Sequence, residues 1–156
     1  MLFRSNSHPH VMGAMAEFLE RLDTSEVQAL YQGLEAIWNA RAARLNARLA
    51  AERLPVQVAN LSTIWTVLYT RPSRYNWMLQ YYLRLEGLAL SWVGTGRFIF
   101  SLNYGDAEFE AVADRFVAAA RQMEADGWWW HDGRLTDKGI RRRILKEMVR
   151  HRLSGK

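Results

Sequence analysis

Hydrophobic residues in the first third of the chain recur with the period of an α-helix. After Pro9, which suits the first turn of a helix, they fall three or four residues apart: Val11, Met12, Met15, Phe18, Leu19 and Leu22. Asp23-Thr24-Ser25 then supplies an N-cap, and the same spacing runs from Val27 to Leu49 until Pro55 stops it. The pattern predicts one helix ending near Leu22 and a second, long helix after it.

The middle of the chain changes to the short apolar runs of β-strands. Val56 to Ala59 and Trp65 to Tyr69 are rich in strand formers and are joined across Asn60 to Thr63. A helical pattern follows from Tyr75 to Leu85, with Gly87 at its C-cap. Two further runs, Leu88 to Trp92 and Phe98 to Leu102, flank the turn Val93 to Gly96 and predict a hairpin.

The last third returns to helical spacing. Acidic residues open a predicted helix that runs from Asp106 to near Gly127, and Thr136 caps a last one that ends at about Arg152. The order of elements predicts an α+β fold, with an antiparallel sheet of three to four strands covered by helices. We divide the chain into residues 1–133, which hold the sheet, and residues 134–156, a basic amphipathic helix.

Composition narrows the classes of protein that fit. With 156 residues, 49% hydrophobic and 12% aromatic, the chain can build one hydrophobic core. It has no cysteine, no apolar run of membrane-spanning length and no signal-peptide pattern, so we expect a cytoplasmic protein without disulfides. The net charge of +5 is concentrated at the C-terminus, where residues 134–156 hold nine lysines and arginines against two carboxylates.

The residue types used in catalysis do not assemble into a complete set. His8 and His10 are two residues apart with no carboxylate cluster nearby, so we expect no metal site. The turn Gly94 to Gly96 precedes a strand, whereas a dinucleotide-binding loop opens a helix. No histidine with an orienting acid stands at a recognisable spacing from the candidate nucleophiles Thr66, Ser91 and Ser101.

Two surfaces could in principle bind nucleic acid. The aromatic residues of the middle segment could stack on bases, but their spacing is more typical of a core: Trp65, Tyr69, Trp77, Tyr81, Tyr82, Trp92 and Phe98. The arginines between Arg141 and Arg152 could bind phosphates, but an apolar seam runs among them: Ile140, Ile144, Leu145, Met148 and Val149. We expect this seam to dock against the rest of the protein, and we expect no nucleic-acid or membrane partner.

Three stretches together resemble a known family. The first is Asn6-Ser-His-Pro9 followed by Val11 to Met15, and the second is Ser62-Thr-Ile-Trp-Thr-Val-Leu-Tyr-Thr70. The third joins Leu83 to Leu90, Phe98 to Leu102 and the acidic helix start at Asp106 to Phe109. Their order and spacing, over about residues 5 to 150, resemble the C-terminal portion of class III aminotransferases, pyridoxal-phosphate enzymes of fold type I. The most similar branch includes glutamate-1-semialdehyde 2,1-aminomutase.

The resemblance implies a small domain beside the large cofactor domain of a homodimeric enzyme that transfers an amino group through pyridoxal phosphate. In the family, the lysine that binds the cofactor lies upstream, in the large domain. The only lysines here are Lys138, Lys146 and Lys156, all in the C-terminal segment, so we expect this chain alone to be inactive and to hold no cofactor.

The resemblance also implies three contact residues. Ser5 and Ser7 stand near the position of a family threonine that reaches the cofactor phosphate of the neighbouring subunit. Arg97 stands where several branches have an arginine that binds the substrate carboxylate, a contact for which a guanidinium is well suited. The alternative is a protein of another class: a free-standing protein-interaction or anion-binding module that keeps this fold.

Overall fold

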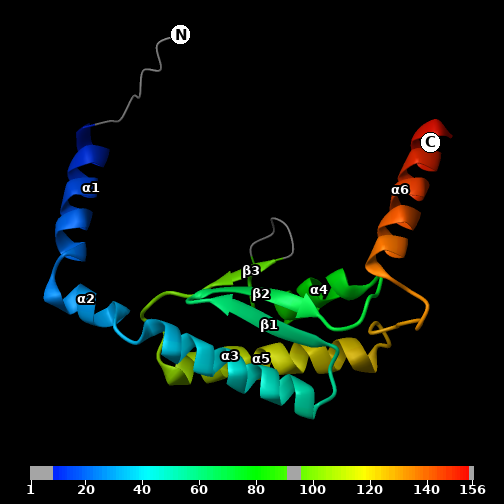
Figure 1. Ribbon diagram of the computed structural model, residues 1–156, viewed down its shortest axis with the longest axis horizontal. Helices are drawn as coiled ribbons and strands as arrows, with labels where there is room; N and C mark the ends of the chain where they lie inside the picture. Colours follow the sequence, from blue (N-terminus) through cyan, green and yellow to red (C-terminus); the bar gives the residue numbers. More distant parts are fainter. Residues whose placement is uncertain (1–8, 91–95, 155–156) are drawn as a thin grey trace, which may run out of the picture. The chain divides into compact units, whose positions relative to one another are not determined.

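The computed structural model describes residues 9–90 and 96–154, drawn in colour in Figure 1. Its chain divides into two compact units, Met1–Ile37 and Trp38–Lys156, each of which is described by itself. Several residues considered above lie outside the described ranges: Ser5, Ser7, His8, Ser91, Trp92, Gly94 and Lys156. The predicted roles of Ser5 and Ser7 therefore stay predictions.

The first unit contains two short helices, α1 (Pro9–Leu22) and α2 (Ser25–Tyr31). The predicted end of α1 at Leu22 and the predicted cap of α2 are confirmed, since the Thr24 hydroxyl accepts a hydrogen bond from the amide of Val27. Neither helix has a buried residue, and α1 leaves its apolar stripe exposed except for the half-buried Leu22: Val11, Met12, Met15, Phe18 and Leu19.

The prediction of one long second helix is wrong. The helix stops at Tyr31, and α3 (Leu34–Ala51) starts after a break at Gln32 and Gly33. Gln32 is extended and Gly33 has a φ of +71°, a left-handed conformation that glycine adopts without steric cost. The hydrophobic spacing continues across the break, so the pattern alone could not reveal it.

The second unit is built on a three-stranded antiparallel sheet in the order β1-β2-β3. The predicted first two strands are confirmed as β1 (Val56–Leu61) and β2 (Ile64–Tyr69), which turn sharply at Ser62 and Thr63. The third, β3 (Arg97–Ile99), pairs with β2 and is shorter than predicted. The α+β class and the antiparallel sheet are thus as the sequence predicts.

The predicted strand at Leu88 is wrong over its described part. Leu88 to Leu90 belong to no strand, although Leu88 and Leu90 are buried and Ala89 between them is exposed. The alternation that suggested a strand therefore reflects burial without ladder hydrogen bonds. Gly87, at φ +79°, ends the preceding helix and redirects the chain; a Cβ there would lie 2.9 Å from Arg115.

Helices cover one face of the sheet. Figure 1 shows α3 and α5 (Asp106–Ala125) side by side below the strands, and α4 (Leu79–Leu85), which a 3₁₀ turn at Asn76–Met78 precedes, packs against α5. The core between these layers is aromatic: the Trp38 and Phe100 rings stack at 4.9 Å, and Trp65 meets Phe100 edge-on at 5.2 Å. The predicted helix from Asp106 is confirmed.

A side chain of α3 protects the outer edge of the sheet. The Asn46 amide donates to the carbonyl oxygen of Val58 at 2.9 Å, and the amide of Val58 donates to the Asn46 side-chain oxygen at 2.8 Å. These are backbone groups that β1, as an edge strand, would otherwise leave unpaired. Asn46 thus ties α3 to β1 and blocks the pairing of another strand there.

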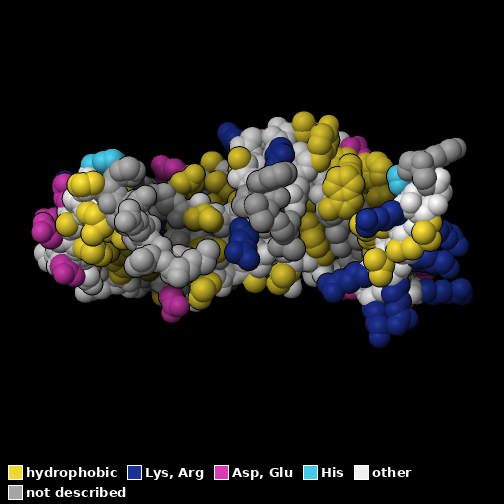
Figure 2. Space-filling model, turned by 90° about the horizontal axis from the view of Figure 1, so that it is seen from above, with side chains coloured by type: hydrophobic (Ala, Val, Ile, Leu, Met, Phe, Trp, Pro, Cys, Tyr) yellow, Lys and Arg dark blue, Asp and Glu magenta, His cyan; other side chains and the backbone are white. Residues whose placement is uncertain are grey.

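The last helix is α6 (Asp137–Leu153), and Thr136 caps it as predicted, because its hydroxyl accepts a hydrogen bond from the amide of Gly139. The prediction that its apolar seam docks against the rest of the protein is wrong for the described residues, because α6 has no buried residue. A polar contact links α6 to the turn after β2: Arg74 in that turn donates to both carboxylate oxygens of Glu147 on α6. Figure 2 shows basic side chains gathered over this helix, with hydrophobic ones among them.

Candidate functional site

On the face of the sheet opposite α3 and α5, several large apolar side chains are exposed among the described residues. Residues directly opposite one another in antiparallel strands share a face, so the register places Leu61, Ile64 and Ile99 in one row across it. The next row is Ala59, Thr66 and Arg97, and Gln57 and Leu68 follow. Leu61 and Ile99 are each 71% exposed, Ile64 46% and Leu68 40%. We call these eight residues the bare sheet face.

Arg97 lies on the short edge strand β3, opposite Thr66. Its side chain is exposed, and no carboxylate of the described residues forms an ion pair with it. Thr66, half-buried, adds a hydroxyl beside it. The bare sheet face therefore offers one free cation and one hydroxyl bordered by aliphatic side chains, an arrangement that can bind a carboxylate once a second surface excludes water.

The helix beside the sheet carries a second exposed apolar stripe. Trp77, Tyr81 and Leu85 recur at every fourth position through the 3₁₀ turn and α4, and they are 63%, 54% and 64% exposed. Figure 2 shows hydrophobic side chains gathered over this part of the surface. The prediction that the aromatic set forms the core is confirmed for Trp65, Tyr82 and Phe98 and wrong for Trp77 and Tyr81.

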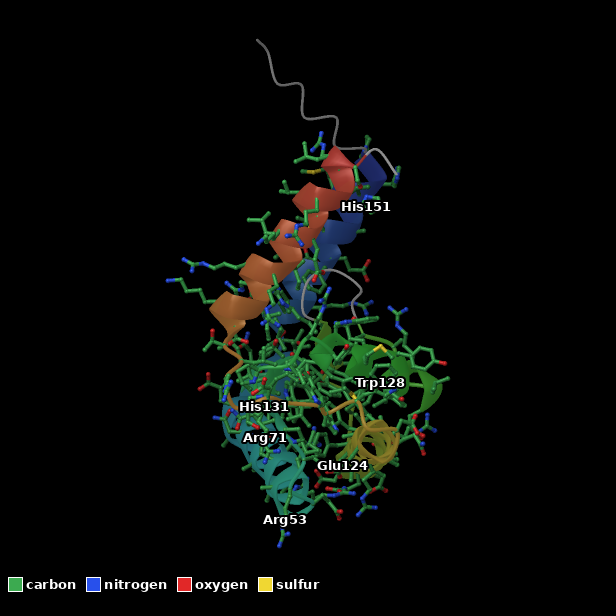
Figure 3. The ribbon with its side chains drawn as sticks, turned by 90° about the vertical axis from the view of Figure 1, so that its right-hand side faces the viewer. Arg53, Arg71, Glu124, Trp128, His131 and His151 are labelled. Carbon is green, nitrogen blue, oxygen red and sulfur yellow. The ribbon has the colours of Figure 1, made fainter. Side chains whose placement is uncertain are left out.

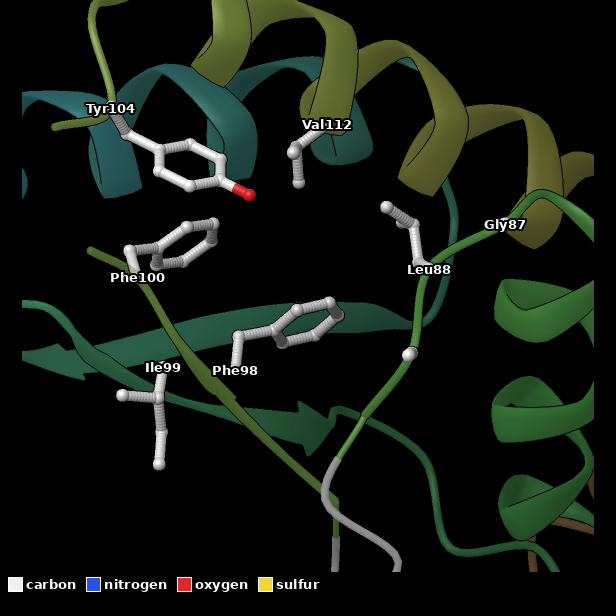
Figure 4. Close-up of a pocket in the computed structure, with 8 residues that line it drawn as sticks. Gly87, Leu88, Phe98, Ile99, Phe100, Tyr104 and Val112 are labelled. Atoms are coloured by element: carbon white, nitrogen blue, oxygen red, sulfur yellow. The ribbon is translucent and has the colours of Figure 1, made fainter.

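A cavity of about 270 Å³ opens between β3 and the segment that follows α4 (Figure 4). The side chains that line it are almost all apolar, although backbone atoms also give the walls polar surface: Gly87, Leu88, Ala89, Phe98, Ile99, Phe100, Tyr104 and Val112. Only the hydroxyl of Tyr104 brings a polar side-chain atom, and Figure 4 shows it pointing inward. Among the described residues the walls hold no carboxylate, imidazole or lysine, so the Tyr104 hydroxyl is the one side-chain group there that could transfer a proton.

The charged groove between α3 and α5 is satisfied internally. Arg48 reaches Asp114 at 2.5 Å and Glu110 at 3.4 Å, and Arg121 pairs with Glu52. The Arg121 guanidinium beside it lowers the pKa of Glu52. Each of these charges has an opposite charge as its neighbour, so the described charged groups of this groove are already paired, and because they are exposed the pairs add little stability.

Arg41 is a buried cation that sequence reasoning missed. It is 6% exposed, and its guanidinium lies 4.5 Å from the centre of the Trp38 ring and 5.5 Å from that of Phe109. Its Nη2 donates to Asp106 Oδ1 at 3.1 Å, and this hydrogen bond lowers the pKa of Asp106. Arg41 thus fixes the first turn of α5 against α3. In a helix rich in Ala, Arg and Leu, no local signal distinguishes it from its exposed neighbours.

The described residues do not fit pyridoxal phosphate by themselves. Lys138 and Lys146 are exposed on α6, and neither lies in the walls of the cavities described above. No group of three or more His, Cys, Asp or Glu residues within residues 9–90 and 96–154 could hold a metal ion. Within the same ranges, no helix is long and apolar enough to cross a membrane.

Comparisons with known proteins add no family assignment: no protein-family model matches the chain, and no curated protein matches it.

Proposed function

We propose that this chain is the C-terminal small domain of a class III pyridoxal-phosphate enzyme related to the glutamate-1-semialdehyde aminomutase branch. Its role is to form the substrate side of an active site whose cofactor lies on a separate large domain. The observation that carries the proposal is the bare sheet face, where exposed aliphatic side chains surround Arg97, which has no ion pair with a described residue.

The physical reason is that β2 has the sequence of a strand buried on both faces. Its residues Ile64, Trp65, Val67, Leu68 and Tyr69 form a nearly continuous apolar run, which is typical of sheets with a layer on each side. Among the described residues of the second unit, Figure 1 shows a layer of helices on one face of this sheet. Large exposed apolar patches mark surfaces that meet another protein or domain, and the stripe on α4 adds to this patch.

Arg97 is proposed to bind the carboxylate of an amino-acid substrate. Within a closed interface its guanidinium would lose most of its water, and a two-pronged hydrogen bond to a carboxylate would then become both stronger and more selective. Thr66 lies opposite and would position the same group. The apolar residues around them would exclude water from the reacting centre. The large domain would supply that centre.

Because the lysines of this chain do not fit the cofactor, the amino-group transfer belongs to the whole enzyme, which by the resemblance is a cytoplasmic homodimer. The lysine that holds pyridoxal phosphate would come from the large domain. Ser5 and Ser7 remain proposed contacts to the cofactor phosphate of the neighbouring subunit. The isolated chain is expected to be inactive.

The test joins the chain to the polypeptide encoded directly upstream of it and compares the product with the isolated chain. We expect only the joined protein to hold pyridoxal phosphate that borohydride fixes to a lysine, and Arg97→Gln to raise the KM for amino acid substrates at least tenfold, since one charge-assisted contact is lost. A stoichiometric cofactor fixed to Lys138 or Lys146 of the isolated chain, with transamination, would refute the proposal.

A second candidate is a free-standing interaction module. The observation that favours it is α6, a helix of seven lysines and arginines and two carboxylates with no buried residue, which would suit an anionic partner. The same joined protein separates the two candidates: an interaction module would gain neither cofactor nor activity from the upstream polypeptide.

A further inference from the structure

The linker before α6 and the turn after β2 enclose a small cleft that the proposed function does not use. It has a volume of about 180 Å³, and three segments line it: Arg74 and Tyr75 from the turn, Trp130 and Leu135 from the linker, and Ile140 and Arg143 from α6. His131 anchors the linker by donating from Nδ1 to the carbonyl oxygen of Pro72 at 2.7 Å. Figure 3 shows His131 beside Arg71, with α6 rising beyond them.

The cleft has a rigid aromatic wall. The Tyr75 ring meets Trp128 at 5.3 Å and Trp130 at 6.4 Å, both nearly edge-on, so the three rings fix one another. Leu135 and Ile140 are half-buried and complete an apolar floor. Trp130 is 52% exposed, so much of its surface is accessible to a ligand. A flat apolar group can therefore stack there without displacing a protein side chain.

The charged groups in the lining are both arginines. Arg74 is held by Glu147, which accepts from both of its terminal nitrogens. Arg143 stands one helical turn before Glu147 and has no salt bridge to a described residue. Arg74 is thus positioned by its ion pair. The Arg74 hydrogen bond, and to a lesser degree the charge of Arg143, lower the pKa of Glu147, while the Arg143 donors have no hydrogen bond to a described residue and can reach a ligand.

We propose that this cleft binds a carboxylate carried on a flat apolar body, with Arg143 pairing the carboxylate and Trp130 stacking on the body. One free guanidinium matches one carboxylate in the two-pronged geometry that arginine favours. The volume lies below the range of drug-sized pockets, about 300 to 1,000 Å³. It therefore suits either a small aryl acid or the last residue of a peptide that ends in an aromatic side chain and a free carboxylate.

The experiment is equilibrium dialysis of the full chain with radiolabelled 3-phenylpropionate, a readout that tolerates self-association. The matched neutral probe is 3-phenylpropanamide. We expect the acid to bind and the amide to bind at least tenfold more weakly, because the charge-assisted hydrogen bonds are lost. Equal binding of acid and amide would overturn the proposal, as would no binding of the acid.

Substitutions in α6 and in the linker before it test whether the acid binds in this cleft. Arg143→Gln should weaken acid binding at least tenfold and Arg143→Lys less, while Arg142→Gln, an exposed neighbour outside the lining, should change it less than twofold. Trp130→Ala should also weaken binding. An equal loss in Arg142→Gln would show non-specific attraction to the basic helix and refute the site.

A second pair of probes distinguishes the two sources of the ligand: a peptide ending in Phe with a free carboxylate and the same peptide with a C-terminal amide. Tighter binding of the free peptide than of 3-phenylpropionate would support a protein terminus as the ligand, and the reverse would support a small aryl acid. Because the cleft shares no residue with the bare sheet face, this result does not depend on the joined-protein experiment.

Discussion

Both faces of the sheet carry large apolar side chains, but the surroundings of these side chains differ greatly. On one face, Val58, Trp65, Val67 and Phe98 are buried under α3 and α5, whereas on the other Ile64, Leu68 and Ile99 are exposed. Both sets are aliphatic or aromatic, so hydrophobicity alone does not decide which face is covered. The difference teaches that this sheet has apolar side chains on both faces, as a sheet between two covering layers does. We propose that the large domain supplies the second covering layer.

The largest expected effect is a difference in stability between substitutions of two neighbouring residues of β3, one on each face of the sheet. Phe98→Ala, on the covered face, should lower the free energy of unfolding by about 3 to 5 kcal/mol, because it leaves a cavity in the core. Ile99→Ala, the next residue but on the bare sheet face, should change it by less than about 0.5 kcal/mol. Urea unfolding followed by circular dichroism measures both. A similar loss in the two variants would show that the bare sheet face is covered within the chain itself.

Self-association should depend on the bare sheet face. The isolated chain is expected to associate through its exposed apolar surface, and light scattering as a function of concentration should detect it. Ile64→Lys combined with Ile99→Lys should weaken association at least tenfold while leaving the urea midpoint nearly unchanged. A wild-type chain that stays monomeric at high concentration would count against an uncovered interface.

The edge of the sheet offers a smaller effect. Asn46→Ala removes both partners of the Val58 backbone groups, and leaving such groups unsatisfied costs about 1 to 3 kcal/mol. Asn39→Ala, on the same helix and hydrogen-bonded only to the Asn60 side chain, is the matched control and should cost less than half as much. The urea midpoints of the two variants test this prediction. Equal losses of stability would mean that Asn46 does not protect the edge of the sheet.

The smallest effect is the pH dependence of the covered layer. Arg41 holds the pKa of Asp106 below its ordinary value of 3.8. The pair therefore stabilises the fold fully above that value, and this stability is lost as the pH falls through the lower folded-state pKa. Asp106→Asn should remove part of the decline in urea midpoint seen on acidification below about pH 4. An unchanged acid profile in this variant would mean that the pair contributes nothing measurable.

Features with local signals could be predicted from the sequence. The caps at Thr24 and Thr136 and the strands β1 and β2 all depend on neighbouring residues, and the structure confirms them. The predicted stop at Pro55 comes late, because α3 ends at Ala51 and the chain turns at Arg53, whose φ is +57°. The break at Gly33 was missed because hydrophobic spacing continues through it. Leu88 to Leu90 imitates a strand because alternating burial and ladder pairing give the same pattern.

The candidate site was predictable only in part. Arg97 was singled out by position, and the structure places it on the bare sheet face, although its role stays a proposal. The rows of the bare sheet face needed the strand register, and the cleft at Trp130 needed three segments that are distant in sequence to come together. Burial of Arg41 and exposure of Trp77 are likewise set by tertiary packing, which residue type does not reveal.

The central claim is that a second body covers the bare sheet face, and the absence of cysteine from the chain allows a direct measurement. Ile99→Cys places a single thiol on that face, and Arg142→Cys places one on the exposed side of α6 as a control. The rate of maleimide labelling should be compared between the isolated chain and the chain joined to its upstream polypeptide. We predict that joining slows labelling at position 99 at least tenfold and leaves position 142 unchanged; equal rates at position 99 in both proteins would contradict the account.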